Sequence, residues 1–424
     1  MTTQPLPAGR SSTRRFWVYW TASAASSLGT AVTAVALPLT AIAVLGASSL
    51  EVSLVTAAGY VAWLVIGLPA GVISQRLPLR GVQVGMDLAR AAALVSVPLA
   101  WWAGLLTVGQ LVVVALVVSF ASVLFDVSSS TFLPSIVPRE QLAARNSLAS
   151  ATHATTELAG PSLGGVLVAA VGAVPALLVD VLSYLVSAAL LRSLPARHVE
   201  HADAWPRVGA MVREGWRFVV GHPVMRPCMI AATTVNFVCG GLLALVPLHL
   251  VRGLQVSPVL VGLLIATEGV GSLVGASLTP ALVRRLGSGA AVRRACVAGT
   301  LAVLLLPLGT GPVGVVLFAL GNAGFAAGVV VFSICTRTHR QVASPPEMLS
   351  RVMATVRFVS WGAVPVGSLT AGVVASGTGP RGALAVFCLL AALTPAVVLT
   401  SRLRTVWALE DLDVVPGEQD ARAR

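Results

Sequence analysis

The stretch that decides the fold runs from Gly109 to Leu133 and reads GQLVVVALVVSFASVLFDVSSSTFL. It contains a single charged residue, Asp126, and it exceeds the roughly 20 apolar residues that a helix needs to cross a bilayer. Eleven other stretches meet the same criterion, so we expect an all-α polytopic membrane protein with twelve transmembrane helices. The expected spans are 17–45, 50–74, 82–104, 109–133, 142–171, 174–193, 225–251, 257–283, 292–308, 311–336, 349–376 and 380–401.

The composition supports a lipid environment for most of the chain. Of its 424 residues, 56% are hydrophobic and 10% are charged, and the mean hydropathy is +0.88. A soluble domain carries about a quarter charged residues. The net charge of +12 comes from arginines in short loops between apolar runs, and this pattern indicates membrane orientation rather than a nucleic-acid partner. The five cysteines form no CxxC pair, so we expect no metal site.

The arginines also predict the topology. With the N-terminus in the cytoplasm, only Arg252 and Arg381 of the 28 basic residues fall on the outer side. We therefore expect a multi-pass protein of the cell (inner or plasma) membrane with both termini cytoplasmic. The expected divisions are a tail (1–15), a six-helix bundle (16–193), a linker with an amphipathic helix (194–222), a second six-helix bundle (223–401) and a second tail (402–424).

Two weak internal matches indicate that the bundles are copies of one another. GLPAGVISQR at 67–76 corresponds to GASLTPALVR at 275–284, which lies 208 positions further on. PREQL at 138–142 corresponds to PPEML at 345–349, at an offset of 207. Duplicated six-helix units with parallel topology predict two pseudo-symmetric bundles that rock about a site between them.

Several short motifs, in order and spacing, carry a resemblance to a known family. They are FWVYW at 16–20, SLG at 27–29, ALPL at 36–39, DLAR at 87–90, Asn146, GPSLGG at 160–165, DVLSY at 180–184 and EGWRFV at 214–219. Over about residues 14–402 the chain resembles the major facilitator superfamily, and within it the drug-efflux branch that includes macrolide and siderophore exporters. The resemblance implies a transporter that functions as a monomer by alternating access. The absence of a Walker loop, a GxSxG elbow and a His/Cys cluster predicts that it is not an enzyme and needs no cofactor.

The chain departs from the family at its cytoplasmic latch. The family pattern in the loop between helices 2 and 3 is GxxxDRxGRR, and here Gln75 replaces the Asp. A neutral amide can form a hydrogen bond but not a charged latch. Asp87 and Arg90 are three residues apart and either take over the latch or form an interfacial surface pair. The predicted cytoplasmic gate comprises Gly71, Gln75, Arg76, Arg80, Asp87 and Arg90. In helix 1, Thr30 follows Gly29 where many relatives have an Asp.

Four acids fall inside the expected spans: Asp126, Glu157, Asp180 and Glu268. We expect no Lys or Arg at comparable depth, and the cost of placing an acid in the membrane interior means that each is expected to have a function or a stabilising partner. Glu157 and Glu268 each lie 15 positions from the cytoplasmic end of a helix, so both are roughly 22 Å deep. The resemblance implies that helices 5 and 8 are neighbours. The two carboxyls then either share a coupling proton, relayed by His153, or serve as protonated packing groups, or contact the substrate directly. For Asp180 the sequence favours a structural hydrogen bond. For Asp126 it favours a role in the gate or in the structure over contact with a cationic substrate. The predicted proton-coupling set is Glu157, Glu268, His153, Asp126 and Asp180.

The resemblance also implies that helices 1, 4, 7 and 10 line a central cavity. The predicted cavity residues are Ser26, Thr30, Ser122, Phe125, Asn236, Phe237, Asn322, Phe325 and, on helix 11, Trp361. This lining is mildly polar and uncharged, which suits a bulky amphipathic compound, although small hydroxyls also serve helix packing. In helix 5, Gly160, Pro161, Gly164 and Gly165 fit a bent helix at the interface of the halves, or ordinary small-residue contacts.

Together these features predict proton-coupled efflux of a hydrophobic or amphipathic small molecule, such as a drug, an antibiotic or a siderophore. The expected partners are this substrate, protons and the lipid bilayer. Two alternatives remain open. The first is an importer or a lipid or lysolipid flippase with the same fold. The second is a non-transporting membrane sensor, which the two missing Asp residues would favour.

Overall fold

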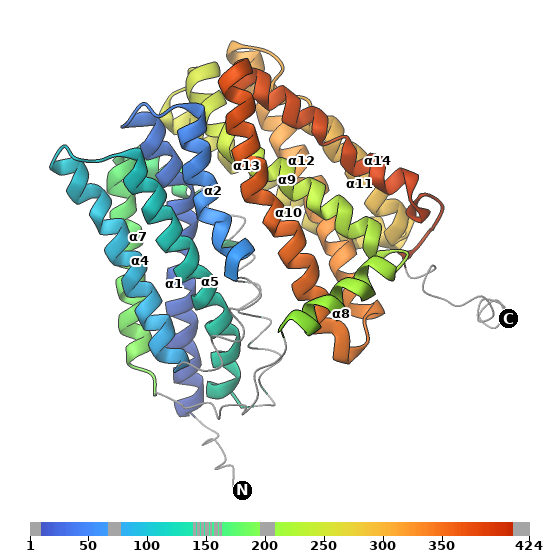
Figure 1. Cartoon of the computed structure of the whole chain (residues 1–424), viewed down its shortest axis with the longest axis horizontal. Helices are drawn as coiled ribbons and strands as arrows, with labels where there is room; N and C mark the ends of the chain where they lie inside the picture. The colour runs from blue at the N-terminus through green and yellow to red at the C-terminus, as the bar shows by residue number, and fades with distance from the viewer. Residues whose placement is uncertain are drawn as a thin grey trace, which may run out of the picture. The chain divides into compact units, whose positions relative to one another are not determined.

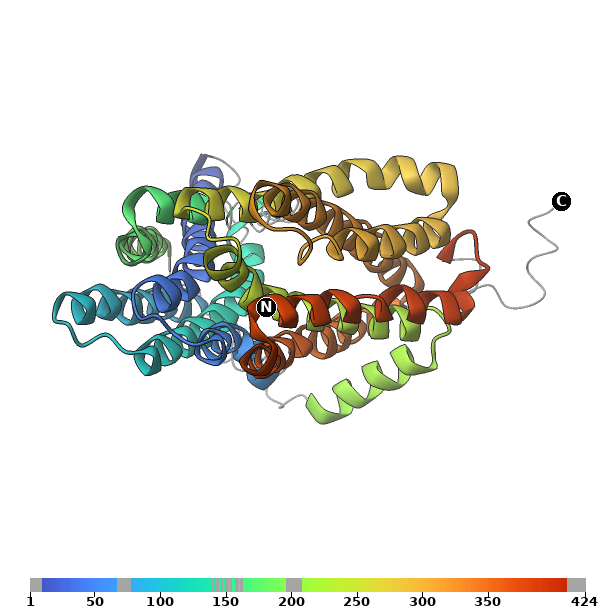
Figure 2. The same ribbon diagram turned by 90° about the horizontal axis from the view of Figure 1, so that it is seen from above.

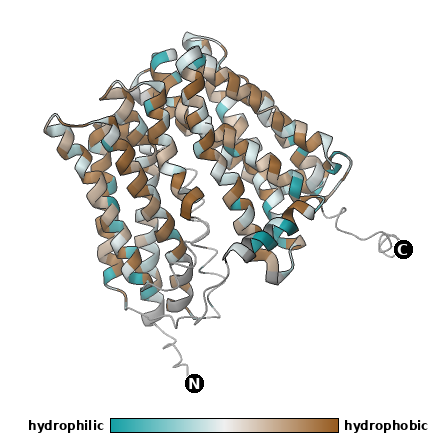
Figure 3. Cartoon of the chain, viewed as in Figure 1, coloured by the Kyte–Doolittle hydropathy of each residue, from teal (hydrophilic) through white to brown (hydrophobic). Residues whose placement is uncertain are grey.

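The computed structural model describes residues 10–66, 78–138, 163–195 and 208–409, with residues 141, 145, 148, 152, 155, 156 and 160. Across these residues every regular element is helical (Figure 1). Nine of the described helices are long and apolar enough to span a membrane. The expectation of an all-α membrane protein is therefore confirmed. In Figure 3 hydrophobic residues run along the spanning helices, whereas hydrophilic residues gather on α8 (Val208–Gly221).

The chain divides into two compact units. Unit 1 comprises residues 1–47 and 58–206, and unit 2 comprises residues 48–57 and 207–424. The helices of unit 1 are α1 (Arg10–Ala43), the second half of α2 (Ser49–Ile66), α4 (Leu79–Trp102), α5 (Val108–Ile136), the helical residues 163–171 and α7 (Ala173–Arg192). Those of unit 2 are α8, α9 (Met225–Leu248), a π-helical turn (His249–Gly253), α10 (Pro258–Leu286), α11 (Ser288–Val303), α12 (Gly311–Ala343), α13 (Pro346–Leu390), α14 (Leu393–Thr400) and a 3-10 turn (Arg402–Arg404).

The helix boundaries follow local sequence signals. At the start of α10, Pro258 occupies the first turn and the Ser257 hydroxyl accepts a hydrogen bond from the Leu260 amide at 3.4 Å. The helix ends at Gly287, whose φ of 80° favours glycine. Within α13, Gly379 has a φ of 72° and is followed by Pro380. This break separates two passes, in agreement with the expected spans 349–376 and 380–401.

In unit 1, α7 packs along α1 and α4, and α4 also contacts α5. One end of the unit has an aromatic and aliphatic core that includes Phe16, Tyr19, Phe132 and Leu191. This core fixes the four helices that carry the polar groups described below.

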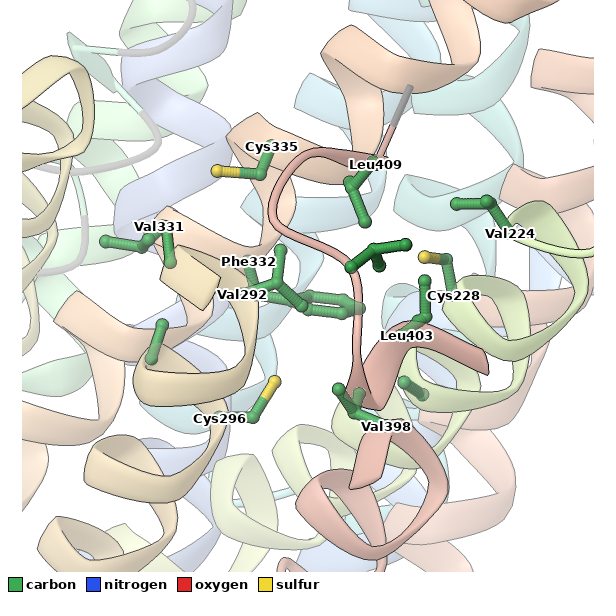
Figure 4. Close-up of a cluster of buried hydrophobic side chains, with 14 residues drawn as sticks. Val224, Cys228, Val292, Cys296, Val331, Phe332, Cys335, Val398, Leu403 and Leu409 are labelled. Atoms are coloured by element: carbon green, nitrogen blue, oxygen red, sulfur yellow. The ribbon is translucent and has the colours of Figure 1, made fainter. Parts of the chain in front are cut away.

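In unit 2, α9 packs on α13, and α12 packs on both α10 and α11. Figure 4 shows the apolar core of one end, where Cys228, Phe332 and Leu403 converge from three segments. The residues after α14 fold back on this core, because the Arg293 guanidinium donates to the carbonyls of Leu403 and Val406, both at 2.7 Å. The expected tail 402–424 is therefore attached to unit 2 through its first residues.

The linker helix α8 lies at the edge of unit 2, outside its spanning helices (Figure 2). Gly215 brings α8 close to α13, since a β-carbon at this position would lie 2.8 Å from the Arg351 carbonyl oxygen. Glu214 and Arg351 form an ion pair at 2.5 Å beside this contact. The first half of α2 also contacts α13 within unit 2, where the Ser368 hydroxyl donates to the Ser53 carbonyl at 3.0 Å.

Candidate functional site

The most unusual feature of unit 1 is a group of charged side chains buried among its membrane-spanning helices. Asp87 and Asp180 are 0% exposed and Arg90 is 2% exposed. Asp87 and Arg90 lie on α4 and form an ion pair, whereas Asp180 lies on α7, within electrostatic range of Arg90. An isolated charge at such a position costs several kcal/mol, so burial of three in one place calls for mutual pairing and hydrogen bonds.

Arg90 is the centre of this network. Its Nη2 donates to the Ser26 hydroxyl at 2.9 Å and to Asp87 Oδ1, and the Ser26 hydroxyl in turn donates to Asp87 Oδ1 at 3.2 Å. Its Nη1 donates to the Ser122 hydroxyl at 3.3 Å. The guanidinium carbon also lies 4.6 Å from the ring centre of Phe125 and 4.2 Å from that of Tyr184. Two cation–π contacts and three hydroxyl or carboxyl partners compensate for the lost hydration of the cation.

Asp180 is held by α1. Its carboxylate accepts hydrogen bonds from the Thr33 hydroxyl and, at 3.1 Å, from the Ser183 hydroxyl. Gly29 makes this approach possible, because a β-carbon there would overlap with Asp180 Oδ1 and lie 2.9 Å from Asp180 Cγ. One position along α1, the Thr30 hydroxyl pairs with the Tyr184 hydroxyl at 3.0 Å. The network therefore extends continuously from α4 through α7 to α1.

The charges of this network do not balance when every group is ionised. Two carboxylates and one guanidinium, those of Asp87, Asp180 and Arg90, sum to a charge of −1. Within the described residues Asp87 Oδ2 and Arg90 Nε also lack hydrogen-bond partners. One proton on either carboxyl would make the group neutral, which is the favoured state in a low-dielectric interior. The arrangement is therefore chemically suited to take up and release one proton.

The structure thus combines residues that the sequence assigned to three separate roles. Ser26, Thr30, Ser122 and Phe125 were expected in the substrate cavity, Asp87 and Arg90 in the gate, and Asp180 in the proton-coupling set; all seven are in this network. The sequence predicted that Asp87 and Arg90 belong to the cytoplasmic gate or to an interfacial surface pair. In the structure they are the ninth and twelfth of the 24 residues of α4, so they lie in its middle.

Of the remaining predicted gate residues, the structure describes Arg80, which contacts the end of α7. Gly71, Gln75 and Arg76 fall outside the described residues. Arg80 donates at 2.5 Å to the carbonyl of Leu194, just beyond the end of α7. Arg80 thus ties α4 to the C-terminal end of α7 within unit 1.

Two other predicted acids, Asp126 and Glu268, lie within the described residues and occupy different surroundings. Asp126 on α5 is exposed. Glu268 on α10 is exposed along its span and lies within electrostatic range of Cys239 on α9. His153 and Glu157 fall outside the described residues, so the proposed Glu157–Glu268 pair remains a prediction.

The predicted cavity residues of unit 2 mostly contact their own bundle. Asn236 donates to the Ala232 carbonyl at 2.9 Å, and Asn322 donates to the Thr267 hydroxyl at 3.1 Å. Phe237 stacks on Phe387 with ring centres 5.5 Å apart. The last two residues of this set are Phe325, which is buried, and Trp361, whose ring centre lies 5.3 Å from the Arg357 guanidinium.

The glycines of helix 5 contact α1 within unit 1. A β-carbon on Gly160 would overlap with the side chain of Ala31, and one on Gly164 would lie 3.0 Å from the Cα of Val32. Gly165 is buried, and Pro161 falls outside the described residues. The close approach of two backbones explains the absence of side chains at Gly160 and Gly164.

Among the buried polar residues that sequence reasoning missed is Gln83 on α4, which is 0% exposed. Gln83, Asp87 and Arg90 follow a spacing of four and three residues, so they lie on one helical face. The buried residues Leu94 and Val97 continue this face. This spacing was the available signal that the three polar residues point into the bundle.

Comparisons with known proteins agree with this architecture. A family model described as transmembrane secretion effector, within the major facilitator superfamily, matches residues 9–419. The multidrug efflux pump Tap of Mycolicibacterium fortuitum is 27% identical over 377 residues, covering 84% of this chain and 88% of Tap. An uncharacterized MFS-type transporter, y4rN, of Sinorhizobium fredii is 26% identical over 329 residues, covering 75% of this chain and 78% of its own.

Solved structures show the same fold at low sequence identity. A bacterial homologue of the iron transporter ferroportin, in an inward-facing state, is 16% identical with a TM-score of 0.73, covering 93% of this chain and 99% of its own. A bacterial homologue of the lysosomal transporter Spinster is 13% identical with a TM-score of 0.73, covering 97% and 100%. The twelve-helix transporter fold is therefore confirmed.

Proposed function

Because the chain belongs to the transmembrane secretion effector family of the major facilitator superfamily, we propose that it exports a hydrophobic or amphipathic small molecule in exchange for protons. The family assignment makes it a secondary transporter and not an enzyme. Beyond this assignment, we propose the class of the substrate, the direction of transport and the coupling ion.

The observation that carries the coupling proposal is the buried network of Asp87, Arg90 and Asp180. A proton on Asp180 leaves Arg90 paired with Asp87 alone. Loss of that proton places a second carboxylate beside the same guanidinium. Because the three groups sit on α4 and α7 and bond to α1, the protonation state changes the forces that hold these helices together. A proton that alters helix contacts in this way can be linked to alternating access.

This network also bears on the missing acid of helix 1. Position 30 holds Thr where many members of the superfamily have Asp, and Thr30 pairs with Tyr184. The carboxyl of Asp180 lies against the preceding residue, Gly29. We propose that α7 supplies to this region the acid that α1 lacks.

Export is supported by the similarity to a relative named as a multidrug efflux pump, and by the uncharged residues Asn236, Phe237, Asn322 and Phe325 predicted for the unit 2 side of the cavity. Uncharged polar and aromatic groups favour substrates that partition into lipid over sugars or anions. We further propose that the protein acts as a monomer in the cell membrane with both termini cytoplasmic, as the arginine distribution predicts.

The test is dye transport in everted membrane vesicles from cells that produce the protein, with an acid-inside pH gradient. Ethidium and rhodamine dyes serve as amphipathic cationic probes. We expect gradient-driven accumulation of at least one dye, its collapse on addition of a protonophore, and its loss in Asp180→Asn. Glu51→Gln is the matched control, because Glu51 is a partly exposed acid outside the network, and Gln can preserve the helix cap that it forms with Ser48.

The alternatives give different results. Gradient-driven movement out of the everted vesicles would indicate an importer, and transbilayer movement of a labelled lysolipid without dye transport would indicate a flippase. No flux of any probe would favour a sensor. Each of these results would contradict the efflux proposal.

A further inference from the structure

A second candidate binding site lies in unit 2, well separated along the sequence from the buried network. It is a pocket of about 630 Å³ where α8 turns into α9 and where α14 ends. The lining residues are Val220, Gly221, His222, Pro223, Arg226, Pro227, Ile230, Val397, Thr400, Ser401 and Arg402. No acidic residue is among them, so the pocket is formally cationic.

The positive charge comes from two arginines on different segments. Arg226 lies in the first turn of α9 and Arg402 follows α14, and both side chains are exposed. Within the described part of unit 2 neither makes an ion pair, whereas Arg351 pairs with Glu214 and Arg293 binds two carbonyl oxygens. Arg226 and Arg402 therefore keep their hydrogen-bond donors for another partner, and guanidinium groups favour phosphate oxygens.

The amides at the N-terminus of α9 already have a hydrogen-bond acceptor within the protein. His222 Nδ1 accepts hydrogen bonds from the Val224 and Met225 amides at 3.2 and 3.3 Å, so it caps this helix. Burial lowers the pKa of His222 below its usual value, which keeps the ring neutral and able to accept. The attraction for an anion thus comes from Arg226 and Arg402.

The other wall of the pocket is apolar. Ile230, one turn further into α9 than Arg226, is 41% exposed, and Val397 faces the pocket from the last turn of α14. Because α9 and α14 belong to candidate membrane spans, these side chains lie where a helix enters the hydrocarbon layer. The pocket therefore has a cationic entrance next to an apolar surface. An amphiphile with an anionic headgroup could bind both, with its headgroup at the arginines and its apolar part on the apolar surface.

The surrounding elements also indicate a membrane interface. The last residues of the amphipathic helix α8 line the pocket, and the same helix carries the exposed residues Arg213, Trp216 and Arg217. Trp and Arg are typical of the headgroup region, and basic pockets near the ends of spanning helices bind anionic lipid headgroups. We propose that this pocket binds the phosphodiester headgroup of an anionic phospholipid through Arg226 and Arg402, with one acyl chain along Ile230 and Val397.

The test measures the lipid that remains bound to the purified protein. The protein is reconstituted in nanodiscs of phosphatidylcholine with or without phosphatidylglycerol, extracted in mild detergent and analysed by native mass spectrometry. We expect retention of phosphatidylglycerol over phosphatidylcholine. Each arginine near a membrane surface contributes roughly fivefold to such binding, so Arg226→Gln/Arg402→Gln should lose about 25-fold. Arg226→Lys/Arg402→Lys should retain most of it.

The matched control is Arg284→Gln/Arg285→Gln in the last turn of α10, which removes the same charge from exposed residues that do not line the pocket. It should bind as the wild type does. Equal loss in this control, or equal retention of the two lipids by the wild type, would overturn the proposal. Displacement of the lipid by excess inorganic phosphate would do so too, since it would assign the site to free phosphate. If the Gln variant fails to fold, the wild-type lipid preference and the Lys variant decide the outcome.

Discussion

The carboxyl of Asp180 on α7 lies directly against Gly29 on α1, at a point where a β-carbon would lie 2.9 Å from Asp180 Cγ and overlap with Oδ1. The close approach of these two helices places Asp180 beside Arg90 and within the hydrogen-bond network of Thr33 and Ser183. A glycine in α1 thus makes room for the acid that we propose to carry the coupled proton.

The first prediction concerns Gly29→Ala. The added methyl group would force α1 and α7 apart, and overpacking of this kind costs about 1–3 kcal/mol. We expect a lower melting temperature in detergent and reduced dye efflux. Gly85→Ala on α4 is the control, because no atom lies within 4 Å of its β-carbon position. A Gly29→Ala protein as stable and active as Gly85→Ala would contradict the close contact.

The second prediction concerns the buried pair of Asp87 and Arg90. Arg90→Gln leaves Asp87 buried without its cation and is expected to cost about 3–5 kcal/mol of stability. The double variant Asp87→Asn/Arg90→Gln removes both charges and should recover most of that loss. Its proton-driven efflux should still be absent. Thermal unfolding and vesicle transport, measured on the same variants, separate the two effects. Full transport by the double variant would exclude this pair from coupling.

The third prediction compares two changes where α8 meets α13. The Glu214 and Arg351 side chains are 51% and 32% exposed, so Glu214→Gln should change stability by less than about 1 kcal/mol, with the ion pair screened by salt. Gly215→Ala should cost more, because its methyl group would lie 2.8 Å from the Arg351 carbonyl oxygen. Limited proteolysis of the linker should be faster in Gly215→Ala only. A larger loss of stability in Glu214→Gln than in Gly215→Ala would indicate that the ion pair, rather than the close contact at Gly215, holds α8 against α13.

The fourth prediction is a pH dependence from His222. Its folded-state pKa is lowered by burial, so the unfolded chain binds the proton more readily and stability must rise with pH. The contribution is complete above the unfolded value of about 6.5 and is lost as the pH falls below it. Protonation would also remove the acceptor that caps α9. Melting temperatures between pH 7.5 and 5 should fall less in His222→Asn, and an identical slope in both proteins would contradict the prediction.

Much of the fold could be predicted because each helix that crosses the lipid bilayer requires about 20 mostly apolar residues, and such runs are visible in the sequence. The break between the expected spans 349–376 and 380–401 coincides with Gly379 and Pro380, and the linker region 209–221 lies within α8. The start of α4 was harder to predict from the sequence. The expected span begins at 82, but the helix begins at Leu79, directly after Pro78. Leu79 is buried, so tertiary contacts rather than hydropathy place the first turn.

The candidate site could be predicted only in pieces. Each of Ser26, Asp87 and Arg90 was identified from residue type, but their meeting depends on which faces of α1 and α4 come together. For Asp180 the sequence favoured a structural hydrogen bond. Its electrostatic interaction with Arg90 depends on how α4 and α7 pack together, which no local pattern encodes. The i, i+4, i+7 spacing of Gln83, Asp87 and Arg90 was the one usable signal.

The most direct test of the account is proton movement driven by substrate in proteoliposomes that contain a pH-sensitive dye. The wild-type protein should move protons when a transported dye is added on one side, and it should also exchange labelled for unlabelled dye without a gradient. Asp180→Asn should keep this exchange, because the Asn oxygen can accept from the Thr33 hydroxyl while its amide NH2 donates to the Ser183 hydroxyl oxygen. The variant should move no protons. Proton movement by Asp180→Asn at the wild-type rate would contradict the claim that the buried network carries the coupled proton.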